Sequence, residues 1–282
     1  MLPLLRLYAR LPLSVIHALG AALGLLALLA PGLRRTIAGN LATAGLSAPG
    51  RVRRVAMELG KEIAELPAIW LRPVAEATAW VREVEGWEHV EAARAAGKGI
   101  LMLGPHLGGL ELAGLYIAER LPITVLYRRL RQDWAHELML IGRQRAQGQP
   151  VEATLAGVRA LFAALKRNQA AWILPDQYAH KGEGHWAPFL GDWTHMPTLL
   201  YKMHEKTGAA LILFVCERLP GVDGFRLSFE PLPPPPVDLD AAMRQVNAAL
   251  EAKIRALPDQ YLWSYQLHRR SRHNPAPDGP AR

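Results

Sequence analysis

The residues with the clearest chemical potential are His106 and Glu111, which follow an uncharged apolar run at residues 100–103. The run stops at Gly104 and Pro105, so the pattern predicts a buried strand that delivers the histidine to a turn. The glutamate lies about 140° around a helix from the histidine, whereas zinc-binding histidine pairs share one face at i and i+4. The spacing therefore favours a histidine in the turn and a glutamate that reaches back from the following helix.

A histidine held by a carboxylate is the arrangement of a general base. We expect Glu111 to fix the imidazole tautomer of His106 and to stabilise the imidazolium. Gly108 and Gly109 would leave room for a substrate close to the backbone, and free N–H groups at the helix start can face an oxyanion. The alternative is a surface histidine beside a surface glutamate, but residues 99–110 contain no Asp, Glu, Lys or Arg, which favours the functional interpretation.

The composition is that of a globular protein with a substantial core, since half of the 282 residues are hydrophobic and 21% are charged. A net charge of +8 suits anionic lipid, an acidic carrier protein or nucleic acid. The chain has no zinc finger, RNP motif or basic-aromatic repeat, so we expect no nucleic-acid partner. The single cysteine, Cys216, lies in an apolar run, which excludes a disulfide framework and a cysteine-based metal site.

The N-terminal region is apolar, because residues 11–33 contain no Asp, Glu, Lys or Arg. Arginines lie on both flanks of this stretch. This length suffices to cross a hydrocarbon core of roughly 30 Å. Three interpretations remain open: a single membrane anchor, a helix that lies in the interface, and a cleaved signal peptide. We expect residues 1–37 to be a membrane-associated helix, residues 38–270 an α/β domain and residues 271–282 a disordered tail.

The remaining pattern alternates strands with helices. Strands are expected at residues 100–103, 123–127, 170–174, 209–215 and 225–229, and helices at 51–71, 110–120, 131–148, 155–166, 198–207 and 238–257. This alternation predicts an α/β fold with a mixed central sheet flanked by helices. The aromatic and basic segment at residues 258–270 is a second candidate for contact with a membrane interface.

Ordered blocks along the chain resemble the lipid A late acyltransferases, the lauroyl/myristoyl acyltransferase family of the His-x4-Asp/Glu acyltransferases. The blocks are RRTIAGNL at 34–41, PHLGGLE at 105–111, YRR at 127–129, GRQR at 142–145, PDQ at 175–177, PFLG at 188–191 and PDQYLW at 258–263. The His-x4-Glu motif alone is weakly specific, whereas the ordered set is strongly specific. Pro105 departs from the Asn or Gly that the family often has before the histidine, and the stretch 176–197 is unusually rich in histidine.

The resemblance implies acyl transfer from a thioester to a hydroxyl, with direct attack and no covalent enzyme intermediate. His106 would deprotonate the hydroxyl, and Glu111 would hold the imidazole. Arg128, Arg143 and Arg145 would bind phosphates of the acceptor or of the carrier's phosphopantetheine. Asp176 would line the site or cap a turn.

No metal and no cofactor are expected, apart from the acyl thioester as co-substrate. The spacings of His180, His185, His195 and His204 match no standard zinc pattern.

The resemblance implies acyl carrier protein as donor, with acyl-CoA as the alternative, and a lipid A precursor as acceptor, with an amino-acid lipid or a glycolipid as alternatives. It places the protein on the cytoplasmic face of a bacterial inner membrane. Two other functions remain open: a lipid-binding protein without chemistry, and a thioesterase in which His106 activates water.

Overall fold

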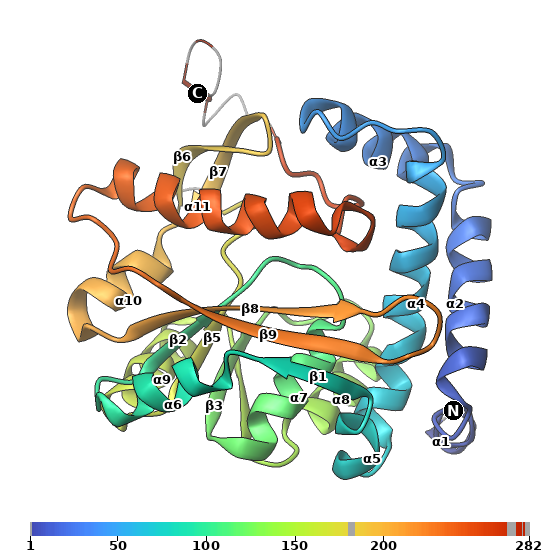
Figure 1. Cartoon of the computed structure of the whole chain (residues 1–282), viewed down its shortest axis with the longest axis horizontal. Helices are drawn as coiled ribbons and strands as arrows, with labels where there is room; N and C mark the ends of the chain where they lie inside the picture. The colour runs from blue at the N-terminus through green and yellow to red at the C-terminus, as the bar shows by residue number, and fades with distance from the viewer. Residues whose placement is uncertain (1, 180–183, 270–274, 278, 280–282) are drawn as a thin grey trace.

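The computed structural model describes residues 2–179, 184–269, 275–277 and 279. Within them, a seven-stranded sheet runs through the middle of the molecule in the order β1-β9-β8-β2-β5-β3-β4 (Figure 1). The strands are β1 (Val81–Glu85), β2 (Ile100–Leu103), β3 (Ile123–Tyr127), β4 (Gly148–Glu152), β5 (Ala170–Ile173), β8 (Ala210–Arg218) and β9 (Phe225–Leu232). The five strands from β8 to β4 are parallel, whereas β9 is antiparallel to β8 and β1 is parallel to β9. The expected mixed central sheet is confirmed.

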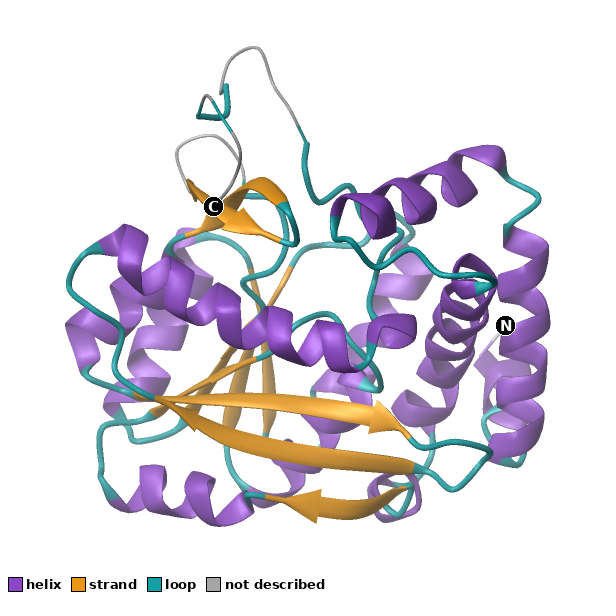
Figure 2. Ribbon diagram, turned by 45° about the horizontal axis from the view of Figure 1, so that its top comes forward, coloured by secondary structure: helices purple, strands orange, loops and turns teal. Residues whose placement is uncertain are grey.

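Helices lie on both sides of this sheet, and a separate antiparallel hairpin of β6 (Gly184–Phe189) and β7 (Asp192–Pro197) stands apart from it (Figure 2). The helices that follow the N-terminal region are α5 (Val74–Thr78), α6 (Trp87–Ala95), α7 (Leu110–Arg120), α8 (Asp133–Arg143), α9 (Leu155–Lys166), α10 (Leu199–Thr207) and α11 (Leu239–Ala256). Because side chains alternate along a strand, Ile100 and Met102 pack into one core cluster, while Leu101 and Leu103 pack into the other. Burial on both faces explains the uninterrupted apolar sequence of β2.

The N-terminal region is divided among three helices, α1 (Leu2–Tyr8), α2 (Leu13–Ala27) and α3 (Pro31–Thr43). Pro12 is the N-cap of α2 and Pro31 is the first residue of α3, because proline lacks the N–H that a helix interior requires. Among the described residues, no one helix has the length and apolar character to cross a membrane; α1 and α2 reach that threshold only as a pair bent by 113°. The expected boundary after residue 37 falls inside α3.

The inner face of α2 packs tightly against α4 (Arg51–Leu71), beside which it runs in Figure 1. A Cβ atom on Gly24 would lie 1.8 Å from the carbonyl oxygen of Ala56, and one on Gly60 would lie 2.0 Å from that of Gly20. The two backbones are therefore in contact, which only small residues allow. Since Ile16 is fully buried as well, this face of α2 belongs to the protein core.

Edge elements differ from the expectations. The helix expected over residues 131–148 ends at Arg143, and β4 follows it. Neither β4 nor β1 was predicted, because an edge strand is largely exposed and shows no clear alternation of apolar and polar residues. The expected interface contact of residues 258–270 is wrong for its aromatic part, since Tyr261 and Trp263 are buried in the core. The expected disordered tail, residues 271–282, lies mostly outside the described residues.

We predict that Gly24→Ala destabilises the protein by about 1–3 kcal/mol, because the added methyl group forces α2 away from Ala56. Urea unfolding in a mild detergent measures the change. The matched control is Gly39→Ala in the exposed part of α3, where nothing lies within 4 Å of the new Cβ atom. That variant should gain up to about 1 kcal/mol from helix propensity. Equal behaviour of the two variants would contradict the close packing of α2 on α4.

Candidate active site

Two residues that are far apart in the sequence, His106 and Asp176, meet at the carboxyl ends of two central strands. These strands, β2 and β5, are parallel neighbours, so the loops that follow them leave the sheet side by side. The imidazole Nδ1 of His106 lies 2.7 Å from Oδ1 of Asp176, and the backbone N–H of His106 donates to Oδ2 over 2.7 Å. One carboxylate thus fixes both the ring and the backbone of the histidine.

The carboxylate of Asp176 is fully buried and accepts a further hydrogen bond from the hydroxyl of Tyr261. An ionised carboxylate can only accept, so Nδ1 of His106 carries the proton and Nε2 carries the lone pair of the neutral ring. The imidazole keeps 19% of its surface exposed, against 1% for the Asp176 side chain. The nitrogen that can act as a base is therefore Nε2, on a ring that is partly exposed.

Opposing influences set the pKa of His106. Burial lowers this pKa, but the charge and hydrogen bond of Asp176, helped by the negative charge of Glu62, outweigh burial and raise it above its usual value. Arg143 acts in the opposite direction. The site therefore stabilises the imidazolium that a general base forms when it accepts a proton.

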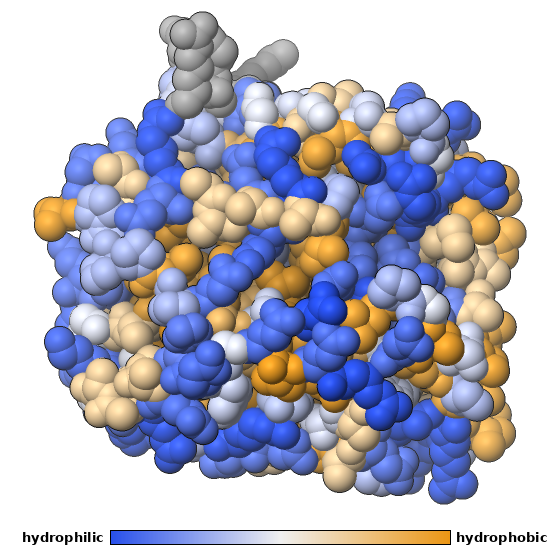
Figure 3. Space-filling view, in the orientation of Figure 1, coloured by the Kyte–Doolittle hydropathy of each residue, from blue (hydrophilic) through white to orange (hydrophobic). Residues whose placement is uncertain are grey.

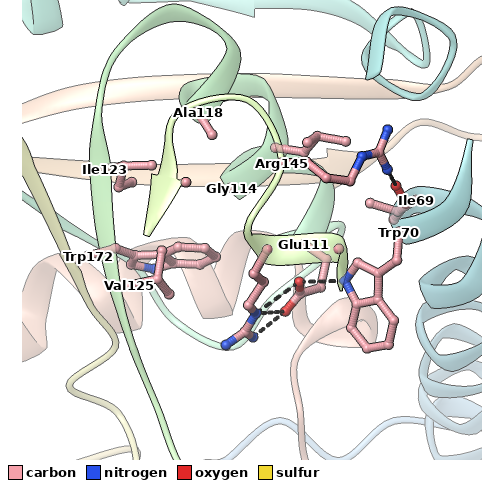
Figure 4. A pocket seen from close by; sticks show the side chains of 13 residues that line it. Ile69, Trp70, Glu111, Gly114, Ala118, Ile123, Val125, Arg145 and Trp172 are labelled. Atoms are coloured by element: carbon pink, nitrogen blue, oxygen red, sulfur yellow. Dashed lines mark hydrogen bonds and ion pairs between the residues drawn. The ribbon is translucent and has the colours of Figure 1, made fainter. Parts of the chain in front are cut away.

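Glu111 does not play the part expected from its spacing to His106. Its carboxylate accepts from Nε of Arg143 over 3.1 Å and from the indole N–H of Trp70 over 2.9 Å, as Figure 4 shows beside a mostly apolar pocket. Burial raises the pKa of Glu111, but the charge of Arg143 and these hydrogen bonds outweigh it and lower the pKa. α7 turns Glu111 toward α4 and α8, whereas the acid that reaches His106 lies in the loop after the neighbouring strand β5.

The three arginines expected at the site have different surroundings. Arg143 pairs with Glu111, and Arg145 donates to the carbonyl oxygens of Ile69, over 2.8 Å, and of Arg72 at the end of α4. Arg143 thus connects the end of α8 to α7, and Arg145, just after α8, connects it to the end of α4. Arg128 is exposed, and its charge acts on Tyr265 near the site.

The glycines after His106 allow the loop to pack closely against other backbone segments, and they leave no open space beside the loop. Gly108 has φ +70°, and a Cβ atom there would lie 2.0 Å from the carbonyl oxygen of Cys216. The N–H of Gly108 donates to Gln260, and that of Gly109 to Cys216. The expectation of substrate room at these two glycines is therefore wrong, because the loop is already hydrogen-bonded to two other segments. The expectation of oxyanion donors at the start of the following helix stays a prediction.

Behind this loop lies a buried ionic cluster that the sequence did not reveal. The guanidinium of Arg218 bonds both oxygens of Glu65, at 2.6 and 3.0 Å, and donates to the carbonyl of Gly108 over 3.1 Å. His17 of α2 lies 2.7 Å from the same Glu65. The cluster therefore connects the N-terminal helix, α4 and the loop that carries the candidate base.

A further acid, Glu62, is half-buried on α4 between this cluster and His106. Burial is the main cause that raises the pKa of Glu62 to about 7, and repulsion from Glu65 and Glu111 adds to it. Attraction to Arg218 and His106 opposes the rise. Sequence periodicity did contain a signal, since Glu62 and Glu65 lie three positions apart on one face of α4.

No group of His, Cys, Asp and Glu side chains in the described part of the chain has the arrangement of a metal site. His195 bonds the carbonyl oxygen of Ala179, and His204 bonds that of Ala209. His185 lies 2.5 Å from Asp240. His180 lies outside the described residues.

The chain is similar to known proteins over most of its length. The family model described as bacterial lipid A biosynthesis acyltransferase matches residues 1–272. The chain is 29% identical to the lipid A biosynthesis palmitoleoyltransferase of Escherichia coli (strain K12) over 97% of this chain and 90% of that protein. It is 28% identical to the lauroyltransferase of the same organism over 95% of this chain and 89% of that protein. A phosphatidylinositol mannoside acyltransferase of Mycobacterium tuberculosis (strain ATCC 25618 / H37Rv) is 29% identical over 55% of this chain and 50% of its own length.

Two isosteric substitutions should separate the roles of the two acids. Asp176→Asn removes the charge that outweighs burial, so we predict a lower pKa of His106, measured by NMR titration of the histidine ring. Glu111→Gln should change that titration far less. It should instead destabilise the fold by roughly 1–3 kcal/mol, because it leaves the partly buried charge of Arg143 without its anionic partner. The opposite pattern would return the orienting role to Glu111.

Proposed function

This chain belongs to the bacterial lipid A biosynthesis acyltransferase family, and we propose that it moves a fatty acyl chain from an acyl carrier protein thioester to a hydroxyl of a lipid A precursor. The observation that carries the proposal is the contact of His106 with Asp176, which leaves the basic lone pair on Nε2 of a partly exposed ring. In this proposal His106 is the general base and Asp176 its orienting acid.

The proposed reaction needs one base and no covalent enzyme intermediate. Nε2 of His106 takes the proton of the acceptor hydroxyl while the oxygen attacks the thioester carbonyl carbon. The tetrahedral oxyanion then collapses, the carbon–sulfur bond breaks, and the imidazolium returns its proton to the thiolate. Asp176 accepts from Nδ1 throughout and stabilises the transient positive charge.

Cys216 supports the direct route because it is unsuited to nucleophilic attack. Its thiol is buried in β8, and burial raises its pKa far above the usual value. A thiol must ionise to attack a thioester, so a buried neutral thiol cannot serve.

Charge supports an acidic donor and a phosphorylated acceptor. The chain carries a net charge of +8, and Arg128, Arg129 and Arg131 are exposed in the loop between β3 and α8. Acyl carrier protein is the proposed donor because a basic surface suits an acidic partner, and acyl-CoA is the alternative. Lipid A precursor is the proposed acceptor by relation to the matched acyltransferases, with an amino-acid lipid or a glycolipid as the alternatives.

The outer face of the N-terminal helices supports attachment to the cytoplasmic face of a bacterial inner membrane. We call this outer surface the leucine face; its exposed residues are Leu4, Leu7, Val15, Leu19, Leu23, Leu26 and Leu29. Figure 3 shows apolar residues along the right margin, the side on which α2 lies in Figure 1. Arg6, Arg10, Arg34 and Arg35 are exposed at the two ends of this region. An apolar face with basic flanks suits a helix pair that lies in the interface of an anionic membrane.

The test of the proposed function is acyl transfer by purified protein, with acyl carrier protein thioester, acyl-CoA, and lipid A precursor supplied separately. We predict a lipid product whose rate falls by about 10²–10⁴-fold in His106→Ala, as expected for loss of a general base. Activity within tenfold of wild type would remove His106 from the mechanism. Lipid binding with no product from either donor would favour a binding protein, and fatty acid release at a rate independent of acceptor would favour a thioesterase.

The membrane proposal predicts that Leu19→Glu combined with Leu23→Glu weakens binding to vesicles of phosphatidylethanolamine and phosphatidylglycerol by more than about tenfold, since burial of one leucine contributes ~1.5–3 kcal/mol. Sedimentation with the vesicles measures the bound fraction. Leu155→Glu is the matched control, because Leu155 is 79% exposed on α9, outside the leucine face. An equal loss in the control, or no loss in the double variant, would show that another surface attaches the protein.

A further inference from the structure

The side chain of Gln177 covers the reactive nitrogen of His106. Its amide nitrogen lies 3.0 Å from Nε2 of the imidazole, on the opposite side of the ring from Asp176. Since Asp176 holds the proton on Nδ1, Nε2 can only accept in the neutral ring, and the Gln177 amide is its donor. The lone pair that would accept a proton from a substrate is thus already hydrogen-bonded.

Two consecutive residues of one loop therefore act on the two nitrogens of one ring. Asp176 is anchored by three hydrogen bonds and is fully buried, whereas Gln177 is half-buried and reaches the ring from the exposed side. A hydroxyl can reach Nε2 only after the amide has moved away. The imidazolium would also expel the amide, because a protonated Nε2 has no lone pair to accept its N–H.

We propose, on the basis of the transferase function inferred above, that Gln177 guards the base against water and thereby limits hydrolysis of the thioester. A bound acceptor lipid makes many contacts away from its hydroxyl, and this binding energy can displace the amide. Water makes no such contacts and must compete with the amide for Nε2 directly. Gln177 therefore favours transfer over hydrolysis. In hydrolysis the same base would remove a proton from water while the water oxygen attacks the thioester carbonyl, and a free fatty acid and a thiol would form.

The guard also affects the charge of the base. A donor that binds the lone pair stabilises the neutral ring, so Gln177 opposes the rise in the pKa of His106 that Asp176 causes. Removal of the amide should consequently raise this pKa and move the acid limb of the pH–rate profile to higher pH. A residue that merely supported the loop would not produce this shift.

The experiment compares Gln177→Ala with wild type in two assays: fatty acid release from acyl carrier protein thioester without acceptor, and lipid product with acceptor. We expect the ratio of hydrolysis to transfer to rise by about two- to tenfold, the range of one ordinary hydrogen bond. NMR titration should show a higher pKa of His106, with its signal assigned by its loss in His106→Asn. Gln149→Ala, at an exposed position of β4, is the control and should change neither quantity.

Gln177→Glu keeps the size of the side chain and serves if the alanine variant fails to fold. Its carboxylate would accept from Nε2 and favour the imidazolium, so both rates should fall near neutral pH and recover as the pH rises. An unchanged ratio together with an unchanged His106 titration would overturn the guard, and so would an equal fall of both rates without a change in titration. Absence of transfer in wild type, with hydrolysis still raised in Gln177→Ala, would overturn the transferase and keep the guard.

Discussion

The hydrogen bond between the buried carboxylate of Asp176 and Nδ1 of His106 depends on the order of strands in the sheet. β2 and β5 are parallel neighbours, paired from Ile100 with Ala170 to Leu103 with Ile173. Their following loops leave the sheet side by side, which brings together residues seventy positions apart. Because the carboxylate also binds the backbone N–H of His106, the ring cannot turn without disturbing the loop, and the imidazole is held in place before any substrate arrives.

The same loop is supported from behind by Arg218, which extends the requirement for order to the N-terminal helices. Arg218 neutralises the buried Glu65 and holds the carbonyl of Gly108, while His17 reaches Glu65 from α2. Removal of Arg218 or of Glu65 would leave the other charge buried and unpaired, which costs more than the cluster gains by forming. The inner face of α2 is thus tied to the site, while its outer leucine face is open to solvent. In the membrane attachment proposed above, a helix with these two faces would couple a lipid surface to the loop that carries His106.

The sequence predicted most of the local elements but not the contacts between them. The helix at residues 51–71 and the strand before His106 have clear periodicity or continuous apolar character, and both were predicted with their observed limits. Glu111 was assigned to His106 because spacing along a chain measures only local distance. The acid that reaches the ring follows another strand, and the PDQ block marked its position without indicating its partner. β1 and β4 were missed because edge strands bury too little of either face to leave a pattern.

The general base proposed at His106 has to be neutral at rest and stable as a cation when it has accepted a proton. The groups around the ring meet these two needs from different directions. Burial and the Gln177 amide favour the neutral ring, whereas Asp176 favours the cation. Glu62, with its pKa near 7, can respond to the charge of the ring. When His106 is neutral, repulsion from the other carboxylates favours the protonated form of Glu62; when His106 is charged, attraction favours the ionised form. Uptake of a proton by His106 therefore favours ionisation of Glu62 beside it.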